Sequence, residues 1–421
     1  MSHFIPNKRK IINDPLHGFI TVPDELTFDV IEHRYFQRLR RIKQLGFTSM
    51  VYPGALHTRF HHALGAMHLM RQAIETLRIK GFRITDDEAA GASLAILLHD
   101  VGHGPYSHAL ENCLVYGMNH EDITVFFLDR LNEEFEGKLE TAIRIFKDEY
   151  PEKFLHQLIS GQLDVDRLDY LMRDSFFTGV SEGVISTDRI IKMLTLVDGE
   201  IAVEGKGIYS IEKFVVARRL MYWQVYFHKT VLAAEYTLLN ILRRAKYLSE
   251  RGAQLFATPA FSFFLSNHIT ADDFRDDRQI LELFSQLDDF DIFSAIKVWT
   301  SHEDRILSML SRALVYRNLP RVELQSGPFD DSFVGELKKR QKAQMQLSDE
   351  DLDYFIFTGS IANDAYIPFR DKINIVDKQG HISDIAMASD QLNVAILSKT
   401  VTKYFICYPK SIGIKEGRSN G

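Results

Sequence analysis

Histidine and aspartate residues are concentrated in one part of the chain, where they favour metal chemistry. Eight of the 16 histidines lie between His57 and His120, and His99 is followed directly by Asp100. Burying a histidine beside an aspartate is costly unless the two side chains pair with each other or coordinate an ion. An isolated dipeptide of this kind more often forms an internal hydrogen bond, so the metal interpretation depends on further ligands.

Further carboxylates lie in the segment 161–174. If the residues after Gly161 form a helix, Asp166, Tyr170 and Asp174 follow one another at intervals of four and share one face. The alternative is a solvated acidic face, which the phenol of Tyr170 at its middle makes less attractive. This stripe can therefore supply a carboxylate to a site that also contains histidines.

A histidine, the His99-Asp100 pair and one distant aspartate would form a divalent-metal site with two imidazoles and two carboxylates. Imidazole suits zinc, iron, nickel, manganese or cobalt, and carboxylates also admit manganese or magnesium. Such an ion acidifies water and polarises a phosphoryl group, and a further histidine could act as a general acid at neutral pH. Spacing alone leaves the neighbouring candidates undecided, namely His61 or His62 and Asp164 or Asp166.

A buried helix is expected to present the His99-Asp100 pair. Thr85 and Glu88 have the spacing of a capping box, so the helix should begin near Asp86. The residues that follow are small or apolar on nearly every face, which is typical of a helix inside a larger α protein. Glycines and Pro105 then end it, which places the pair in the last turn, where free carbonyl groups favour a cation.

Other elements are expected on both sides of this helix. The residues 10–22 and 194–203 predict hairpins, the second with an Asp-Gly turn, and a long helix is expected over 211–248. That helix carries cations and aromatic residues on one face, which indicates contact with an anion. The residues 253–320 predict amphipathic helices without chemical features. Strands are expected near 354–358, 373–376, 381–385 and 403–408.

Composition restricts the classes of protein. The 421 residues are 45% hydrophobic and 25% charged, with a formal net charge of −7, which argues against a general binder of nucleic acid or anionic membranes. A local basic pocket for nucleic acid stays open. Cys113 and Cys407 lie far apart, which fits a reducing compartment. No run approaches the ~20 apolar residues that span a bilayer, so we expect a cytoplasmic protein without membrane contact.

The fold class expected from these patterns is mainly α. Residues 1–320 should form a large helical bundle with small β-hairpins, and residues 321–421 a small mixed α/β C-terminal lobe.

Five segments carry a resemblance to a known family, namely 13–18, 36–46, 52–62, 99–108 and 164–170. In this order they resemble the HD superfamily of metal-dependent phosphohydrolases. Within it they are most similar to the deoxynucleoside triphosphate triphosphohydrolases, including members that join a sterile-alpha-motif domain to the HD domain. The resemblance covers residues 10–235 best, fades by about 320, and assigns residues 1–320 as an HD phosphohydrolase domain.

The resemblance implies roles for individual residues around a divalent metal ion. The metal ligands would be His62, His99, Asp100 and Asp166. His103 and His120 match catalytic histidines beside the α-phosphate, and Glu111 stands where the family has an aspartate that orients the equivalent of His120. The substrate-binding positions would be Gln44, Leu45, Arg59, His108, Arg167, Tyr170, Asp174, Arg218, Tyr226 and Lys229.

Within that substrate site, Tyr170 would be the wall that disfavours a 2′-hydroxyl group on the sugar. The chain departs from the family at Tyr222 and Phe227, which replace polar side chains near the base and sugar. The nucleobase preference is therefore not implied by the resemblance.

Some members of the family are activated by a nucleotide at a second site. Lys10, Asn13, Gln37 and Arg40 match parts of it, whereas Glu32 replaces the aspartate that reads guanine. The resemblance also implies a homo-oligomer, either a dimer or a tetramer.

The leading hypothesis is hydrolysis of a deoxynucleoside triphosphate to the deoxynucleoside and inorganic triphosphate. One alternative keeps the site and changes the substrate to another nucleotide or phosphate ester. An alternative from another class is a non-catalytic nucleotide sensor or nucleic-acid-binding module, which the complete ligand set argues against. Fold alone does not decide between them.

Overall fold

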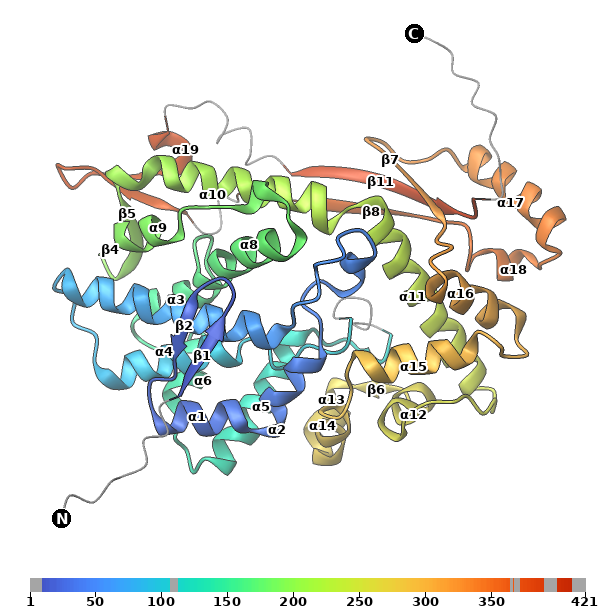
Figure 1. Cartoon of the computed structure of the whole chain (residues 1–421), viewed down its shortest axis with the longest axis horizontal. Coiled ribbons are helices and arrows are strands. Elements are labelled where there is room, and N and C mark those ends of the chain that lie inside the picture. Colours follow the sequence, from blue (N-terminus) through green and yellow to red (C-terminus); the bar gives the residue numbers. More distant parts are fainter. Residues whose placement is uncertain (1–9, 107–112, 364–365, 367–371, 390–399, 411–421) are drawn as a thin grey trace, which may run out of the picture.

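Three helices at the centre of the molecule position the candidate metal ligands. The computed structural model describes residues 10–106, 113–363, 366, 372–389 and 400–410. Helix α3 (Arg59–Ile79) packs against both α4 (Asp86–Leu98) and α8 (Val165–Thr178), and all three lie on the left of Figure 1. Segments far apart in the sequence are thereby brought to one place.

Helix α4 begins as its sequence predicts. The hydroxyl of Thr85 accepts a hydrogen bond from the amide of Glu88, and the Glu88 carboxylate accepts one from the amide of Thr85. This capping box satisfies the first free amides of the helix, and its small and apolar residues bury nearly every face. The helix ends at Leu98 with His99 as its C-cap, so the His99-Asp100 pair lies just beyond the last turn rather than within it.

Further helices complete the helical part of the molecule. They differ in length but bury apolar residues in the same core, which confirms the mainly α fold class. Their bounds are α1 (Glu25–Glu32), α2 (Arg34–Gln37), α5 (His120–Glu134), α6 (Glu140–Phe146), α7 (Lys153–Ser160), α9 (Thr187–Met193), α12 (Pro259–Ser266), α13 (Ala271–Asp276), α14 (Arg278–Phe284), α15 (Asp289–Trp299) and α16 (Arg305–Val315).

The prediction of one continuous helix over 211–248 is wrong. The structure has α10 (Ile208–Met221), a π-helical turn (Tyr222–Tyr226) and then α11 (Lys229–Ser249). The amide of Phe227 bonds to the carbonyl of Tyr222, and the extended residue His228 caps the new helix by accepting from the amide of Thr230. Aromatic residues continue through the π-helical turn at helical spacing, so the periodicity of the sequence could not reveal that the helix is interrupted.

Both predicted hairpins are present. Strand β1 (Ile11–Asp14) pairs antiparallel with β2 (Gly18–Thr21), and β4 (Leu194–Val197) pairs antiparallel with β5 (Glu200–Glu204). In the second hairpin Asp198 and Gly199 both have positive φ values, as a two-residue turn of type I′ requires. A short parallel pair, β3 (Val115–Tyr116) with β6 (Ile269–Thr270), joins two loops.

The strands after residue 320 are divided between two sheets. Strands β7 (Arg321–Gln325), β11 (Val401–Tyr408) and β8 (Phe357–Asn363) form one antiparallel sheet in that order, seen at the upper right of Figure 1. Helix α17 (Asp331–Met345) packs near this sheet, and α18 (Asp349–Leu352) follows it.

The other strands of this region join the central bundle. Strand β9 (Asn374–Val376) pairs in parallel with β5 and antiparallel with β10 (Ile382–Asp384), which leads into α19 (Ile385–Ala388). The sheet therefore combines residues from both sides of the expected boundary at 320, and that boundary stays a prediction. Two details differ from expectation: β7 was not predicted, and β8 begins at Phe357 rather than at 354.

One large apolar core runs through most of the described residues, and a second small cluster of Leu337, Ile356, Ile406 and Tyr408 lies between α17 and the C-terminal sheet. The large core extends from Ile20 and Val22 to Phe405 and Cys407, so one face of the C-terminal sheet packs on the same core as the helices. Among the described residues, no helix combines the length and the apolar composition needed to cross a bilayer.

The contact between α3 and α8 requires a glycine, which gives a stability prediction. A Cβ atom at Gly65 would lie 2.0 Å from Oδ1 of Asp169 and 2.2 Å from Nη2 of Arg173. We expect Gly65→Ala to lower the free energy of unfolding by about 1–3 kcal/mol, as measured by urea denaturation. The matched control is Gly335→Ala on α17, where no described atom lies within 4 Å, and it should be neutral or stabilising. Equal effects of the two substitutions would contradict this assignment.

Candidate functional site

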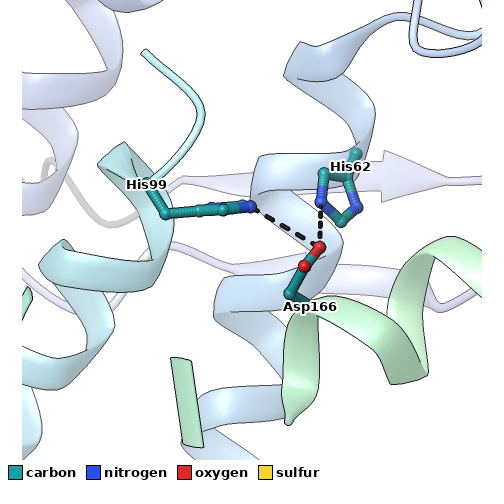
Figure 2. A group of neighbouring side chains, drawn as sticks. All are labelled: His62, His99 and Asp166. Atoms are coloured by element: carbon teal, nitrogen blue, oxygen red, sulfur yellow. Dashed lines mark ion pairs between the residues drawn. The ribbon is translucent and has the colours of Figure 1, made fainter. Parts of the chain in front are cut away.

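Three side chains from separate elements converge on one point and could hold a metal ion. They are His62 from α3, His99 at the end of α4 and Asp166 from α8, and their ligand atoms all lie within 4.8 Å of one another. Figure 2 shows both imidazoles directed at the carboxylate. Oδ1 of Asp166 lies 2.9 Å from Nε2 of His62 and 3.6 Å from Nε2 of His99.

The other ring nitrogen of each histidine is held by a neighbour. Nδ1 of His99 lies 2.6 Å from the carbonyl oxygen of Ile96, and Nδ1 of His62 lies 2.8 Å from Oδ2 of Asp169. These contacts favour tautomers with the proton on Nδ1, which leave a lone pair on Nε2. Both Nε2 atoms are buried and face Oδ1 of Asp166, but neither makes a hydrogen bond of good geometry with any described residue. Orphaned imidazole nitrogens beside a carboxylate fit a bound divalent cation.

Asp100 lies at the edge of this group. Its Oδ1 atom is 3.3 Å from Nε2 of His99, and its Oδ2 atom is 3.9 Å from Nε2 of His62 and accepts a 2.6 Å hydrogen bond from Arg59. Burial raises the pKa of Asp100, but Arg59 and the nearby histidines outweigh it and hold that pKa well below its usual range. The carboxylate is therefore ionised and available at the same point.

The charges at this point are balanced for a cation. Burial lowers the pKa of His62, but the carboxylates of Asp166 and Asp169 outweigh it and raise that pKa to about 10. Burial raises the pKa of Asp166, but His62 and His99 outweigh it and lower that pKa below its usual range. Without a metal ion, His62 is therefore protonated and supplies a positive charge between the carboxylates. A metal ion that binds to His62 must displace this proton.

Asp169 is the residue that orients His62, and the sequence interpretation missed its role. Besides Nδ1 of His62, this fully buried carboxylate contacts Nε2 of His17 at 2.7 Å and accepts from Nε of Arg173 at 2.8 Å. Arg173 in turn donates to Asp14. Such outer partners fix the ring orientation of metal ligands. The available signal was the presence of Asp14, His17 and Asp169 in the segments that carry the family resemblance.

A pocket of about 500 Å³ opens over these ligands. Most of the site residues that the resemblance implies, and that the structure describes, line this pocket. His62 is buried and does not line it. Arg218 and Lys229 lie on α10 and at the start of α11 and do not line it, and His108 and Glu111 lie outside the described residues. The lining residues among those proposed are Gln44, Leu45, Arg59, His99, Asp100, His103, His120, Asp166, Arg167, Tyr170, Asp174 and Tyr226.

One wall of the pocket is formed by two histidines. The ring centroids of His103 and His120 are 3.8 Å apart, with the planes almost perpendicular at 85°. Nε2 of His103 lies 3.7 Å from Oδ1 of Asp100. Both imidazoles thus lie near the metal ligands, where an imidazole can transfer a proton.

Another part of the pocket lining is aromatic and holds a buried carboxylate. Tyr226 packs edge-on against Tyr170 and Tyr222. Its hydroxyl donates to Oδ2 of Asp174, while Oδ1 of Asp174 lies 2.8 Å from Nε2 of His57. His57 was not among the proposed site residues. A lone histidine is a weak signal, and only the fold shows that it holds Asp174 in place.

A second cavity of about 320 Å³ contains most of the residues proposed for a second nucleotide site. Lys10, Asn13 and Arg40 line it, together with Glu32. Gln37 lies beside it and accepts a 2.8 Å hydrogen bond from Nε of Arg40.

Family models match two parts of the chain. The model of the HD domain matches residues 59–174, and the model of the HD associated region matches residues 185–249. The first range contains α3, α4 and the first ten residues of α8, and the second contains the π-helical turn at the pocket.

Similar proteins extend over more of the chain. The chain is 32% identical to the uncharacterized protein YwfO of Bacillus subtilis, over 96% of this chain and 93% of that protein. It is 31% identical to a deoxynucleoside triphosphate triphosphohydrolase, the SAMHD1 homolog of Dictyostelium discoideum, over 58% of this chain and 51% of that protein. The crystal structure of a phosphohydrolase from Bacteroides thetaiotaomicron superposes with a TM-score of 0.92 at 52% identity, over 95% of this chain and 99% of that one.

The contact between Asp169 and His62 gives a prediction about metal binding. Both oxygens of Asp169 accept hydrogen bonds, one from Nδ1 of His62 and the other from Nη2 of Arg173. Asp169→Asn replaces one of these oxygens by an NH₂ group, which cannot accept, so the imidazole loses its fixed orientation. We expect manganese affinity, measured by isothermal titration calorimetry, to fall by about 10–100-fold.

The control for this variant is Asp272→Asn, which removes an exposed carboxylate far from α3, and circular dichroism verifies that each variant is folded. His17→Gln is a milder variant of the same network and should weaken binding less. Unchanged manganese affinity in a folded Asp169→Asn protein would refute the role of Asp169.

Proposed function

The chain belongs to the family of HD-domain phosphohydrolases, and we propose that it hydrolyses deoxynucleoside triphosphates to the deoxynucleoside and inorganic triphosphate. The observation that carries the proposal is the pocket of about 500 Å³, which joins the metal-binding side chains to cationic and aromatic walls. A triphosphate needs cations, and a nucleoside needs an aromatic surface and a few polar groups.

The ligands for the metal would be His62, His99, Asp100 and Asp166. When bound there, a divalent ion supplies a Lewis acid that lowers the pKa of water and polarises a phosphoryl oxygen. In the proposed reaction, water attacks the α-phosphorus and loses a proton, and the bond from phosphorus to the 5′-oxygen of the sugar breaks.

His103 and His120 would handle the proton of the leaving group. Because they line the pocket beside Asp100, an imidazolium there can protonate the 5′-oxygen as it leaves. The products are then the neutral deoxynucleoside and inorganic triphosphate. Glu111 is proposed to orient His120.

The rest of the pocket would bind the substrate. Arg59 and Arg167 are proposed to hold phosphates, and Tyr170 to pack under the sugar where a 2′-hydroxyl would clash. Tyr222 and Phe227 also line the pocket and can stack on any base, which supports a broad base preference. The remaining proposed contacts are Gln44, Leu45, His108, Asp174, Arg218, Tyr226 and Lys229.

A product-resolved assay tests this function. Each deoxynucleoside triphosphate is incubated with the protein and manganese or magnesium, and the products are separated by ion-exchange chromatography. We expect deoxynucleoside and inorganic triphosphate in equal amounts, with turnover lost in Asp166→Ala because the carboxylate no longer holds the ion.

Other products would favour other functions. Orthophosphate without triphosphate would favour a different nucleotide or phosphate ester as substrate. Nucleotide binding without turnover, in protein shown to contain metal, would favour a nucleotide sensor and refute the proposed reaction.

The second cavity supports a proposal of activation by a nucleotide. Its cationic residues Lys10 and Arg40 can hold phosphates, while Glu32 and Asn13 offer polar contacts to a base. We expect a nucleotide that is not itself hydrolysed to raise the rate with a second substrate, and Arg40→Ala to abolish this increase. Light scattering during the same titration tests the proposed homo-oligomer. A rate independent of added nucleotide would refute the activation.

A further inference from the structure

Asp289 is the first residue of α15, and its carboxylate lies between two segments of the substrate pocket. It belongs to the region 253–320, where the sequence shows no chemical features, and it lies beyond the ranges 59–174 and 185–249 that the family models match. Its side chain nevertheless reaches the walls of the pocket through backbone contacts.

Both oxygens of this carboxylate accept a backbone hydrogen bond. Oδ2 accepts from the amide of Lys43 and Oδ1 accepts from the amide of Tyr106, each at 3.0 Å. Asp289 is only 5% exposed, so water competes little for these bonds. A single carboxylate thus joins two segments that are 63 residues apart along the chain.

The first segment carries residues of the substrate pocket. Residues 42–44 run antiparallel to residues 57–59, because the amide of Gln44 bonds to the carbonyl of His57 and the amide of Arg59 bonds to the carbonyl of Ile42. Lys43 directs its own amide to the opposite side, where Asp289 accepts it. The extended segment 42–44 is therefore held from both sides.

The second segment carries His103. The carbonyl of His103 accepts a hydrogen bond from the buried guanidinium of Arg38 at 2.7 Å. Three residues later Tyr106 has a positive φ of 50° and stacks on Phe47, with ring centroids 4.4 Å apart. A residue in that backbone conformation needs support from its surroundings, and the hydrogen bond from its amide to Asp289 provides it.

Asp289 does not serve as the cap of its own helix. That role belongs to Asp288, which accepts from the amide of Phe290, while Asp291 accepts from the amide of Asp288 to complete a capping box. Neither carboxylate oxygen of Asp289 is needed to cap the helix. Helix capping therefore does not explain why a carboxylate is buried at this position.

We propose that Asp289 is a positioning residue, which holds the segment of Gln44 and the turn of His103 at a fixed distance from each other beside the pocket. The proposal rests on the phosphohydrolase reaction of the family, but it does not depend on which phosphate substrate the chain uses.

The role requires an ionised carboxylate, because only that group offers an acceptor at both oxygens. Burial raises the pKa of Asp289 to about 6, although the amides of Lys43 and Tyr106 oppose the rise. Above that pH both bonds are present, and below it the added proton removes one acceptor. The charged and titratable groups around Asp289 are Lys43, Tyr106 and Asp288, with Arg38, Arg41 and Asp291 next to them.

Amide hydrogen exchange tests the positions of the two segments without reference to activity. In Asp289→Asn one of the two amides faces an NH₂ group, so we expect faster exchange at Lys43 or Tyr106 than in the wild type. The matched control is Asp291→Asn, which removes a carboxylate of the same helix that contacts neither segment. It should leave the exchange of both amides unchanged.

Activity at varied pH tests the consequence for the reaction. Bis(4-nitrophenyl) phosphate with manganese serves as the probe, so failure with deoxynucleoside triphosphates alone would not affect this experiment. We expect kcat of Asp289→Asn to be about tenfold lower than that of the wild type near pH 8, with unchanged metal content. The ratio of the two kcat values should approach one as the pH falls through about 6, because the wild type then loses the same acceptor.

The outcomes separate positioning from a structural role. Faster exchange at Lys43 or Tyr106, together with a ratio of kcat values that approaches one on acidification, supports the proposal. A ratio that stays constant with pH, or an equal loss of activity in Asp291→Asn, would overturn it, as would unchanged exchange in Asp289→Asn.

Discussion

The hydrogen bond between Nδ1 of His62 and Asp169 fixes the geometry on which the site depends. Asp169 is fully buried, and its other partners are Arg173 on the same helix and His17 in the turn of the N-terminal hairpin. A buried carboxylate that lost a partner would be costly, so α3, α8 and this hairpin are held in one arrangement. Because Nδ1 is committed, Nε2 of His62 is left for the metal, and the fold decides the ligand atom before any ion binds.

A second buried carboxylate, that of Asp289, holds the segments around the pocket in a different way. Asp169 orients a metal ligand through its side chain, whereas Asp289 accepts from the backbone amides of Lys43 and Tyr106. The first orients a ligand of the ion, and the second holds two neighbouring segments that carry residues of the pocket. Both are more than nine-tenths buried, so their bonds compete little with water. The carboxylates that hold the site together are therefore distinct from those that would bind the ion.

The sequence predicted elements whose signals are local. The start of α4 follows from the capping box of Thr85 and Glu88, and the β4–β5 hairpin follows from Asp198-Gly199, because each is determined by residues a few positions apart. The break at the π-helical turn was missed because an aromatic stripe continues through it. The parallel pairing of β5 with β9 joins residues about 170 apart, and no local pattern indicates such a partner.

The same distinction applies to the candidate site. His62, His99 and Asp166 could be named because metal chemistry restricts the residue types, and the family resemblance chose among neighbours; the structure brings these three together. His57 and Asp289 could not be named, since their partners are a carboxylate that spacing does not place beside them and two backbone amides. Every residue except proline carries a backbone amide. A carboxylate that accepts from backbone amides therefore has no characteristic partner residue that a sequence pattern could reveal. The residues that perform chemistry can therefore be read from sequence more readily than the residues that place them.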